Sequence, residues 1–228
     1  MSQFKHSAKG DKIVSTRPLE ISRYRAFTRA NHWVTAICAI LLMLSGFAFF
    51  HPALYGLTSL FGGGETARWL HPILGIVLFV SFLLMFFQMV RLNIVSSEDI
   101  EWIKKSGDVI RANHDNLPEL PKYNAGQKVM FWAMSLLILV LAVTGVMMWE
   151  EFFADLVTIP TRRIALALHA LAAIIMLLVF IVHVYAAIWT RGTIRAMTRG
   201  TVTGGWAYRH HRKWLRELAG RRSHGSAK

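Results

Sequence analysis

The sequence IALALHALAAIIMLLVFIVHVYAAIWT, residues 164–190, contains no Lys, Arg, Asp or Glu. Three further stretches share this property, at 32–64, 69–90 and 129–149. A helix needs about 20 apolar residues to cross a hydrocarbon layer of about 30 Å, and each stretch is that long. We therefore predict four transmembrane helices, at residues 32–51, 69–91, 128–149 and 164–190.

The overall composition is also that of a membrane protein. Hydrophobic residues make up 54% of the 228 residues and charged residues 17%, against roughly 25% in a typical soluble domain. These values exclude a water-soluble globular domain. An outer-membrane barrel is excluded too, because its strands are shorter and alternate in polarity. The predicted fold class is all-α, an integral membrane four-helix up-down bundle.

The net charge of +13 is distributed unevenly between the predicted connections. Seven of the 26 basic residues lie in 1–31, six in 91–128 and ten in 191–228, whereas the other two connections hold one and two. Basic residues collect on the cytoplasmic side of membrane proteins, so both termini are predicted to be cytoplasmic. The charge then indicates attraction to anionic membrane lipid, and no nucleic-acid partner is expected.

This distribution predicts three parts of the chain. They are a cytoplasmic N-terminal segment, a four-span domain and a basic cytoplasmic tail, at 1–31, 32–190 and 191–228. Cys38 is the one cysteine. The chain alone therefore forms no disulfide, no c-type haem attachment and no cysteine-ligated iron–sulfur cluster.

Histidine is the residue type that points to chemistry. Of ten histidines, five lie in polar segments, where a solvated imidazole is expected: His6, His114, His210, His211 and His224. His51 precedes Pro52 and is expected to mark a helix end. The remaining four lie within or at the ends of the apolar spans, where an ionisable side chain is costly and usually functional: His32, His71, His169 and His183.

The predicted topology places these four histidines at two depths. His169 and His183 are 14 residues apart on one helix, which is about 21 Å and nearly four full turns, so they share a face. His71 falls at the depth of His169, near the periplasm, and His32 at the depth of His183, near the cytoplasm. Two facing imidazoles suit the axial positions of a b-type haem, and two pairs predict two haems.

Two other kinds of membrane protein could carry these four histidines. A histidine-based metal-ion transporter would usually add carboxylates or thiolates in its spans, and here the spans hold none except Cys38. The third interpretation is a haem-free membrane anchor in which the four histidines serve only in packing. It does not explain why the histidines form two pairs at two depths.

Several motifs carry a family resemblance. They are RANHW at 29–33, LHPILGI at 70–76, KYNAGQK at 122–128, FW at 131–132, TGV at 144–146 and HVY at 183–185. Together they resemble the cytochrome b, or gamma, subunits of respiratory formate dehydrogenases, from about residue 23 to 217. RANHW and HPxxG are shared more loosely with hydrogenase cytochromes b, and KYNAGQK is the more specific motif.

The resemblance implies a role for each matching residue. It implies one haem b held by His71 and His169 and a second held by His32 and His183. It also implies a quinone site (menaquinone or ubiquinone) by the cytoplasmic haem, which uses Asn124 and Gly126.

The start of the third span is consistent with such a site. First-turn amides lack intrahelical partners, and the helix dipole favours a reduced quinone oxygen there. Gln127 and Lys128 are further candidates for quinone contact. The alternative for Asn124, Gly126, Gln127 and Lys128 is an ordinary helix cap.

The resulting hypothesis is an electron-transfer and quinone-reducing subunit of a formate dehydrogenase in the bacterial inner membrane, serving anaerobic respiration. Electrons would come from a periplasmic iron–sulfur (beta) subunit, and substrate oxidation would occur on a molybdenum- or tungsten-containing (alpha) subunit. No catalytic residue for that oxidation is expected in this chain. A hydrogenase or thiosulfate reductase cytochrome b is the nearest alternative, and a higher oligomer of the heterotrimer is left open.

Overall fold

The computed structural model describes residues 10–16, 18–105, 107 and 118–225. The chain forms two compact units. The first, here called the bundle unit, contains Ala30–Phe86 and Trp132–Val184. The second, the terminal unit, contains Met1–Arg29, Phe87–Phe131 and Tyr185–Lys228. Each unit is therefore assembled from segments that are far apart in the sequence.

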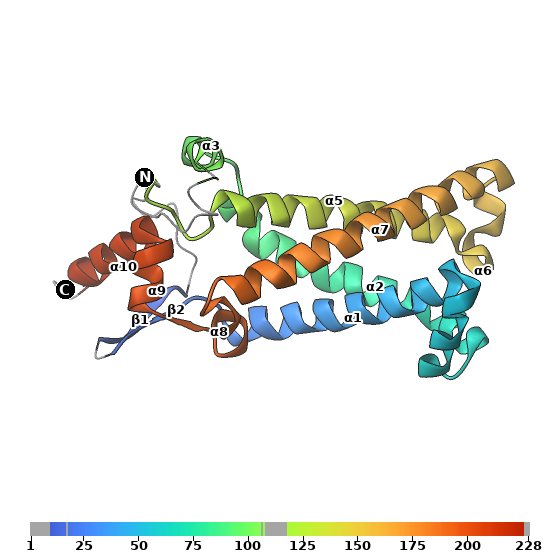
Figure 1. Cartoon of the computed structure of the whole chain (residues 1–228), viewed down its shortest axis with the longest axis horizontal. Coiled ribbons are helices and arrows are strands. Elements are labelled where there is room, and N and C mark those ends of the chain that lie inside the picture. Colours follow the sequence, from blue (N-terminus) through green and yellow to red (C-terminus); the bar gives the residue numbers. More distant parts are fainter. Residues whose placement is uncertain (1–9, 17, 106, 108–117, 226–228) are drawn as a thin grey trace. The chain divides into compact units, whose positions relative to one another are not determined.

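Four long helices dominate the chain, and Figure 1 shows them running alongside one another. They are α1 (Ala26–Phe50), α2 (Gly64–Met89), α5 (Ala125–Met148) and α7 (Ile159–Trp189). All four are long and apolar enough to cross a membrane, so the predicted four-helix membrane architecture is confirmed. Each helix begins a few residues before its predicted start. The prediction took only the charge-free residues of each span. The helical backbone extends into the flanking turns, because long polar side chains there can reach the water at the membrane surface.

The connections within the bundle unit are partly helical. The first span is followed by the 3₁₀ helix η1 (Pro52–Phe61), and His51 caps it because its Nδ1 accepts a hydrogen bond of 3.2 Å from the Ala53 N–H. Gly62 and Gly63 then take φ values of 84° and 109°, which glycine adopts without steric cost. The short helix α6 (Glu150–Phe153) and the 3₁₀ turn η3 (Ala154–Leu156) precede α7.

The core of the bundle unit lies where all four helices meet. Its buried members are Cys38, Leu78, Phe82 and Ile138, and Met176 of α7 packs against them. A polar link joins α1 to α2 beside this core. Asn31 Nδ2 donates to the Ser81 carbonyl oxygen at 2.8 Å, and the Thr35 and Ser81 hydroxyls lie 2.7 Å apart. Such interhelical hydrogen bonds fix helix register where surrounding lipid supplies no partners.

The terminal unit contains a small sheet that the sequence analysis did not anticipate. Strands β1 (Lys12–Thr16), β2 (Leu19–Ser22) and β3 (Thr201–Thr203) pair antiparallel in the order β1-β2-β3. The sheet therefore joins the beginning of the chain to its tail. The remaining elements are η2 (Val90–Leu92), α3 (Ser97–Lys104), α8 (Thr193–Thr198), α9 (Gly204–His210) and α10 (Arg212–Gly225).

The tail is polar in composition but contributes apolar side chains to a core. Ile21 and Val202 of the sheet are buried together with Trp206, Trp214 and Leu218 of α9 and α10. The large aromatic side chains supply most of this core, since each ring removes a large apolar area from water.

A buried charge cluster completes the terminal unit. The Lys122 ammonium donates to Asp11 Oδ1 at 2.6 Å, and the Trp214 indole N–H donates to Asp11 Oδ2 at 3.0 Å. The Arg23 guanidinium donates to the Lys122 carbonyl oxygen at 2.5 Å and lies 4.9 Å from the Trp206 ring centre. Burial lowers the pKa of Lys122, partly offset by the Asp11 carboxylate. The cluster connects the N-terminal segment, the residues before α5 and the tail.

His211 corrects one expectation, because it is buried and not solvated. Its side chain is 1% exposed, and its Nδ1–H donates to the Pro121 carbonyl oxygen at 2.7 Å. Burial, with a smaller effect from the Arg23 charge, holds the pKa of His211 well below its ordinary value. His210 lies against the Trp206 ring. His6, His114 and the His224 side chain lie outside the described residues.

Acidification is predicted to destabilise the terminal unit through His211. An unfolded histidine binds a proton below about pH 6.5, whereas the buried neutral imidazole does not, so stability falls as pH drops through that value. The slope for one proton reaches at most about 1.4 kcal/mol per pH unit. The thermal midpoint of the detergent-solubilised protein, followed by tryptophan fluorescence, should fall between pH 7.5 and 5.5.

The matched variant is His211→Gln, whose amide can still donate to the Pro121 carbonyl oxygen but does not titrate. Its midpoint should change less between the two pH values than that of the wild type. Equal pH dependence in the two proteins would show that His211 does not control the effect.

Candidate functional site

The structure brings together the histidines of each predicted pair. The ring centres of His71 on α2 and His169 on α7 are 6.4 Å apart. The ring centres of His32 on α1 and His183 on α7 are also 6.4 Å apart. Both pairs lie within the bundle unit, and α7 provides one member of each because its two histidines share a face.

Two buried hydroxyl groups orient the first pair. Ser45 Oγ lies 2.7 Å from His71 Nδ1, and Thr144 Oγ1 lies 2.8 Å from His169 Nδ1. Each hydroxyl donates its own proton to a carbonyl one turn earlier, from Ser45 to Leu41 at 2.9 Å and from Thr144 to Val140 at 2.7 Å. A hydroxyl has one proton, so each oxygen must accept from the imidazole. Both rings are therefore held as Nδ1–H tautomers, which leaves Nε2 able to bind a metal.

A glycine follows each hydroxyl residue, and the imidazole ring lies beside it. A Cβ at Gly46 would lie 3.6 Å from His71 Cε1, and a Cβ at Gly145 would lie 3.4 Å from His169 Cε1. The imidazoles thus pack directly over the backbone of α1 and α5. The Ser45-Gly46 and Thr144-Gly145 dipeptides are equivalent devices on two helices. No role was predicted for these hydroxyls from the sequence, although the repeated dipeptide was a signal that could have found them.

The second pair has different surroundings. His32 Nδ1 is buried and has no hydrogen-bond partner within the described residues. The His32 ring meets the Trp33 ring edge-on, with centres 5.7 Å apart. A buried ring nitrogen without a partner costs free energy, so the site is suited to receive a further polar group or water.

The histidine pairs fit a haem. A metal–imidazole bond is about 2 Å long, so two imidazoles on opposite sides of one ion have ring centres roughly 6 Å apart. Among the described residues, no group of three or more His, Cys, Asp or Glu could hold a metal ion. A tetrahedral zinc site needs three or four protein ligands, whereas haem iron takes four ligands from the macrocycle and two from the protein. Paired histidines match the second requirement.

The predicted quinone residues lie at the start of α5, in the terminal unit. Asn124 Oδ1 accepts from the Gln127 N–H at 2.8 Å, and Gln127 Oε1 accepts from the Asn124 N–H at 3.1 Å. These reciprocal bonds form a capping box. A Cβ at Gly126 would lie 3.4 Å from Trp102 of α3, so α3 covers the first turn of α5. The hydrogen bonds of Asn124 and Gln127 are those of an ordinary helix cap. Contact of these residues with quinone stays a prediction.

Lys128 is committed to an ion pair. Its ammonium donates to Asp99 Oδ2 at 2.6 Å and to the Ile94 carbonyl oxygen at 3.0 Å. The side chains of Lys128 and Asp99 are 5% and 2% exposed. A buried pair of this kind holds both partners in place, because removing one leaves the other as an uncompensated charge.

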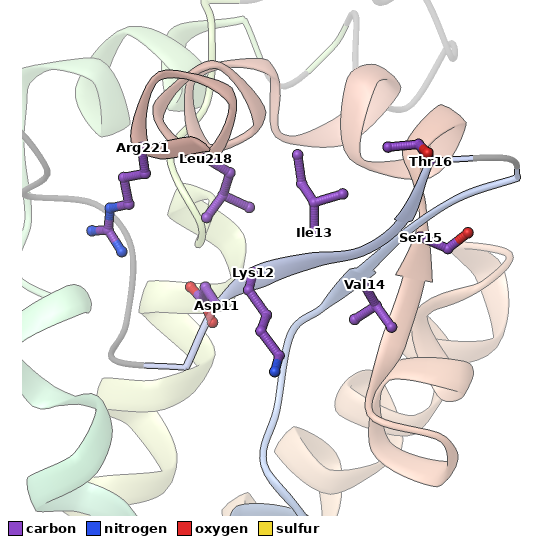
Figure 2. A pocket seen from close by; sticks show the side chains of 8 residues that line it. All are labelled: Asp11, Lys12, Ile13, Val14, Ser15, Thr16, Leu218 and Arg221. Atoms are coloured by element: carbon purple, nitrogen blue, oxygen red, sulfur yellow. The ribbon is translucent and has the colours of Figure 1, made fainter. Parts of the chain in front are cut away.

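A cavity elsewhere in the terminal unit is separate from these residues. It is lined by residues 11–16 along β1 and by Leu218 and Arg221 of α10 (Figure 2). None of the four paired histidines and none of residues 124–128 lines it. The cavity is therefore not the candidate site.

Comparisons with known proteins identify the family of the chain. The family model for prokaryotic cytochrome b561 matches residues 23–200. The chain is 42% identical over 198 residues to the formate dehydrogenase cytochrome b556(fdo) subunit of Escherichia coli K12, covering 87% of this chain and 93% of that protein. It is 41% identical over 198 residues to the nitrate-inducible cytochrome b556(Fdn) subunit of the same strain, covering 87% and 91%.

A more distant relative extends the same pattern. The formate dehydrogenase cytochrome b556 subunit of Haemophilus influenzae is 37% identical over 206 residues, which cover 90% of this chain and 87% of that protein. With the four membrane-spanning helices, these similarities identify a multi-pass protein of the bacterial inner membrane. The chain belongs to the prokaryotic cytochrome b561 family, and the resemblance of its motifs to formate dehydrogenase cytochrome b subunits is confirmed.

Proposed function

We propose that this chain is the membrane cytochrome b subunit of a formate dehydrogenase complex, and that it holds two haems b and reduces quinone. One observation carries the proposal. Two pairs of facing histidines, each with ring centres 6.4 Å apart, lie in a chain that is 37–42% identical to such subunits.

The four histidines are the proposed axial ligands. His71 and His169 hold one haem, and His32 and His183 hold the other. When bound, each haem supplies a one-electron redox centre. Ser45 and Thr144 keep the Nδ1 protons of the first pair in place, so that Nε2 of each ring would be the nitrogen that binds the iron.

The start of α5 is the proposed quinone site. The capping box uses the side-chain oxygen Oδ1 and the backbone N–H of Asn124. The side-chain nitrogen Nδ2 takes no part in the box. That nitrogen is a hydrogen-bond donor of the kind that a quinone oxygen accepts. Gly126, Gln127 and Lys128 complete the proposed contacts.

The proposal also includes the direction of electron transfer across the membrane and the partner subunits. The concentration of basic residues supports cytoplasmic termini and a cytoplasmic middle connection. Electrons would enter from a periplasmic iron–sulfur (beta) subunit, with formate oxidised on a molybdenum- or tungsten-containing (alpha) subunit. Each electron moved inward works against a membrane potential worth about 2.3 kcal/mol per 100 mV, so the complex would conserve energy.

The similarity to formate dehydrogenase subunits favours formate as the electron donor over hydrogen or thiosulfate.

Substitution of the paired histidines should remove haem in matched sets. The purified wild-type protein should contain two b-type haems per chain by pyridine haemochrome assay. His71→Ala and His169→Ala should each lose the same haem, and His32→Ala and His183→Ala should each lose the other, because one imidazole cannot complete the axial set.

His51→Ala is the matched control, since His51 caps η1 and lies outside both pairs. It should keep both haems, as judged by the reduced-minus-oxidised spectrum. A wild-type protein from native membranes that contains no haem would overturn the proposal. Retention of both haems in His183→Ala would overturn the assignment of that ligand.

The hydroxyl groups should set the potential of one haem. Ser45→Ala or Thr144→Ala removes an acceptor from an Nδ1–H, which makes the imidazole a weaker electron donor and favours the reduced metal. A hydrogen bond of about 1 kcal/mol corresponds to roughly 40 mV for one electron, so the midpoint potential should rise by tens of millivolts at most.

Spectroelectrochemical titration measures this shift for each haem separately. Only the haem of His71 and His169 should respond, and both haems should remain bound. Ser59→Ala serves as the control, because its hydroxyl donates to the Gly56 carbonyl oxygen and touches neither histidine. An unchanged potential in both hydroxyl variants would contradict this role.

A further inference from the structure

Asp99 has an unusual arrangement of hydrogen bonds. Its Oδ2 accepts from the Ser96 N–H at 2.7 Å, from the Ser96 hydroxyl at 2.9 Å and from the Lys128 ammonium at 2.6 Å. Its Oδ1 is buried and has no partner within the described residues. The residue as a whole is 2% exposed. An unsatisfied oxygen on a buried carboxylate is costly, so its position requires an explanation.

Capping of α3 does not supply that explanation. The capping box of Ser96 and Asp99 uses Oδ2, and so does the ion pair with Lys128. Oδ1 contributes to neither. It is therefore the atom of this cluster that remains able to bind a proton or a water molecule.

Lys128 connects Asp99 to the proposed quinone site. It lies one turn after Asn124, and its backbone N–H donates to the Asn124 carbonyl oxygen at 3.0 Å. The two side chains therefore share a face of α5. Asp99 and the Ile94 carbonyl oxygen engage two of the three ammonium donors of Lys128. Trp102, on the same helix as Asp99, covers Gly126, so α3 and the first turn of α5 form one cluster.

We propose that Asp99 and Lys128 deliver a proton to the quinone, a role that rests on the proposed function. Reduction of a quinone to a quinol consumes two electrons and two protons, and the electrons come from formate oxidation. Lys128 gives one proton to a quinone oxygen, so that an N–H bond breaks and an O–H bond forms. The second proton comes from the aqueous phase without this pair.

Burial couples the release of that proton to uptake of another. Once Lys128 is neutral, the Asp99 carboxylate is a buried charge without a counterion, which is strongly unfavourable. Asp99 then takes a proton from the aqueous phase at Oδ1, and a half-turn of its carboxyl group about the Cβ–Cγ bond brings that proton to the Lys128 amine. The ion pair is restored, and one external proton has been consumed for each proton delivered.

The neighbouring charged groups do not offer an equivalent route. Glu98 pairs with Lys213 at 2.6 Å, and Glu101 pairs with Lys105 at 2.9 Å. The hydrogen bond from Lys213 lowers the pKa of Glu98 to about 2. Glu98 is thus held in its own ion pair, and Asp99 is the carboxylate of α3 that contacts Lys128.

Two variants of the full complex in native membranes test the proposal. Lys128→Arg keeps a positive charge beside Asp99, but arginine does not release its proton. Asp99→Asn keeps an oxygen for the Ser96 N–H but does not carry a proton. Both should lower kcat for formate-dependent reduction of a soluble quinone analogue by at least about tenfold, the lower range for loss of a general acid. The KM for the quinone should stay within about twofold.

The loss should deepen as pH rises from 6 to 8.5, because protons then reach the quinone from solvent alone. Reduction of the haems by formate without quinone should remain normal in both variants. Glu98→Gln removes a neighbouring carboxylate and should match the wild type in all of these measurements.

Wild-type kcat across this pH range in Lys128→Arg overturns the proposal, as does an increased KM with kcat retained. If Asp99→Asn also fails to reduce its haems, that variant has lost assembly, and Lys128→Arg alone then decides the outcome. A wild-type complex that reduces its haems but not quinone overturns this inference together with the quinone part of the proposed function.

Discussion

A buried imidazole nitrogen without a partner costs free energy, and this constraint shapes the surroundings of the first histidine pair in the bundle unit. At His71 and His169 one nitrogen is satisfied by a hydroxyl of the neighbouring helix, which is itself tied to its own backbone. These hydrogen bonds favour the Nδ1–H tautomer of each ring. The two histidines of α7 face histidines of two different helices, His32 on α1 and His71 on α2.

A different interaction holds the terminal unit together. The Asp11 carboxylate receives hydrogen bonds from Lys122 and Trp214, residues that belong to the middle and the end of the chain. Arg23 lies among the surrounding aromatic rings and contacts the Lys122 carbonyl oxygen. Charges buried this deeply stabilise a fold only when every partner is in place. The N-terminal segment and the tail are consequently mutually dependent parts of one unit.

The sequence allowed the prediction of features that follow from hydrophobicity and helical period. The four spans came from charge-free runs, and the pairing of histidines came from a 14-residue interval on one helix. The sheet was missed because β3 has three residues and its partners lie at the other end of the chain, so no local pattern marks it. Burial of His211 was missed for the same reason, since its partner Pro121 is 90 positions away.

Within the candidate site, the proposed ligands could be predicted from the sequence, whereas the groups that orient them could not. A histidine in an apolar span is conspicuous in the sequence, because an ionisable group there is costly. A serine or threonine is not, because its hydroxyl can bond to its own helix. Ser45 and Thr144 do so and also accept from a neighbouring helix, which only the three-dimensional arrangement reveals.

The start of α5 shows that a structural role and a chemical role need not use the same atoms. Asn124 caps α5 through its side-chain oxygen Oδ1, while its side-chain nitrogen Nδ2 lies outside the cap. Asp99 caps α3 and pairs with Lys128 through Oδ2, while Oδ1 has no partner among the described residues. A side chain that is held by one atom leaves its other atom in a defined position for binding. The helix cap at the start of α5 is therefore compatible with the proposed quinone site.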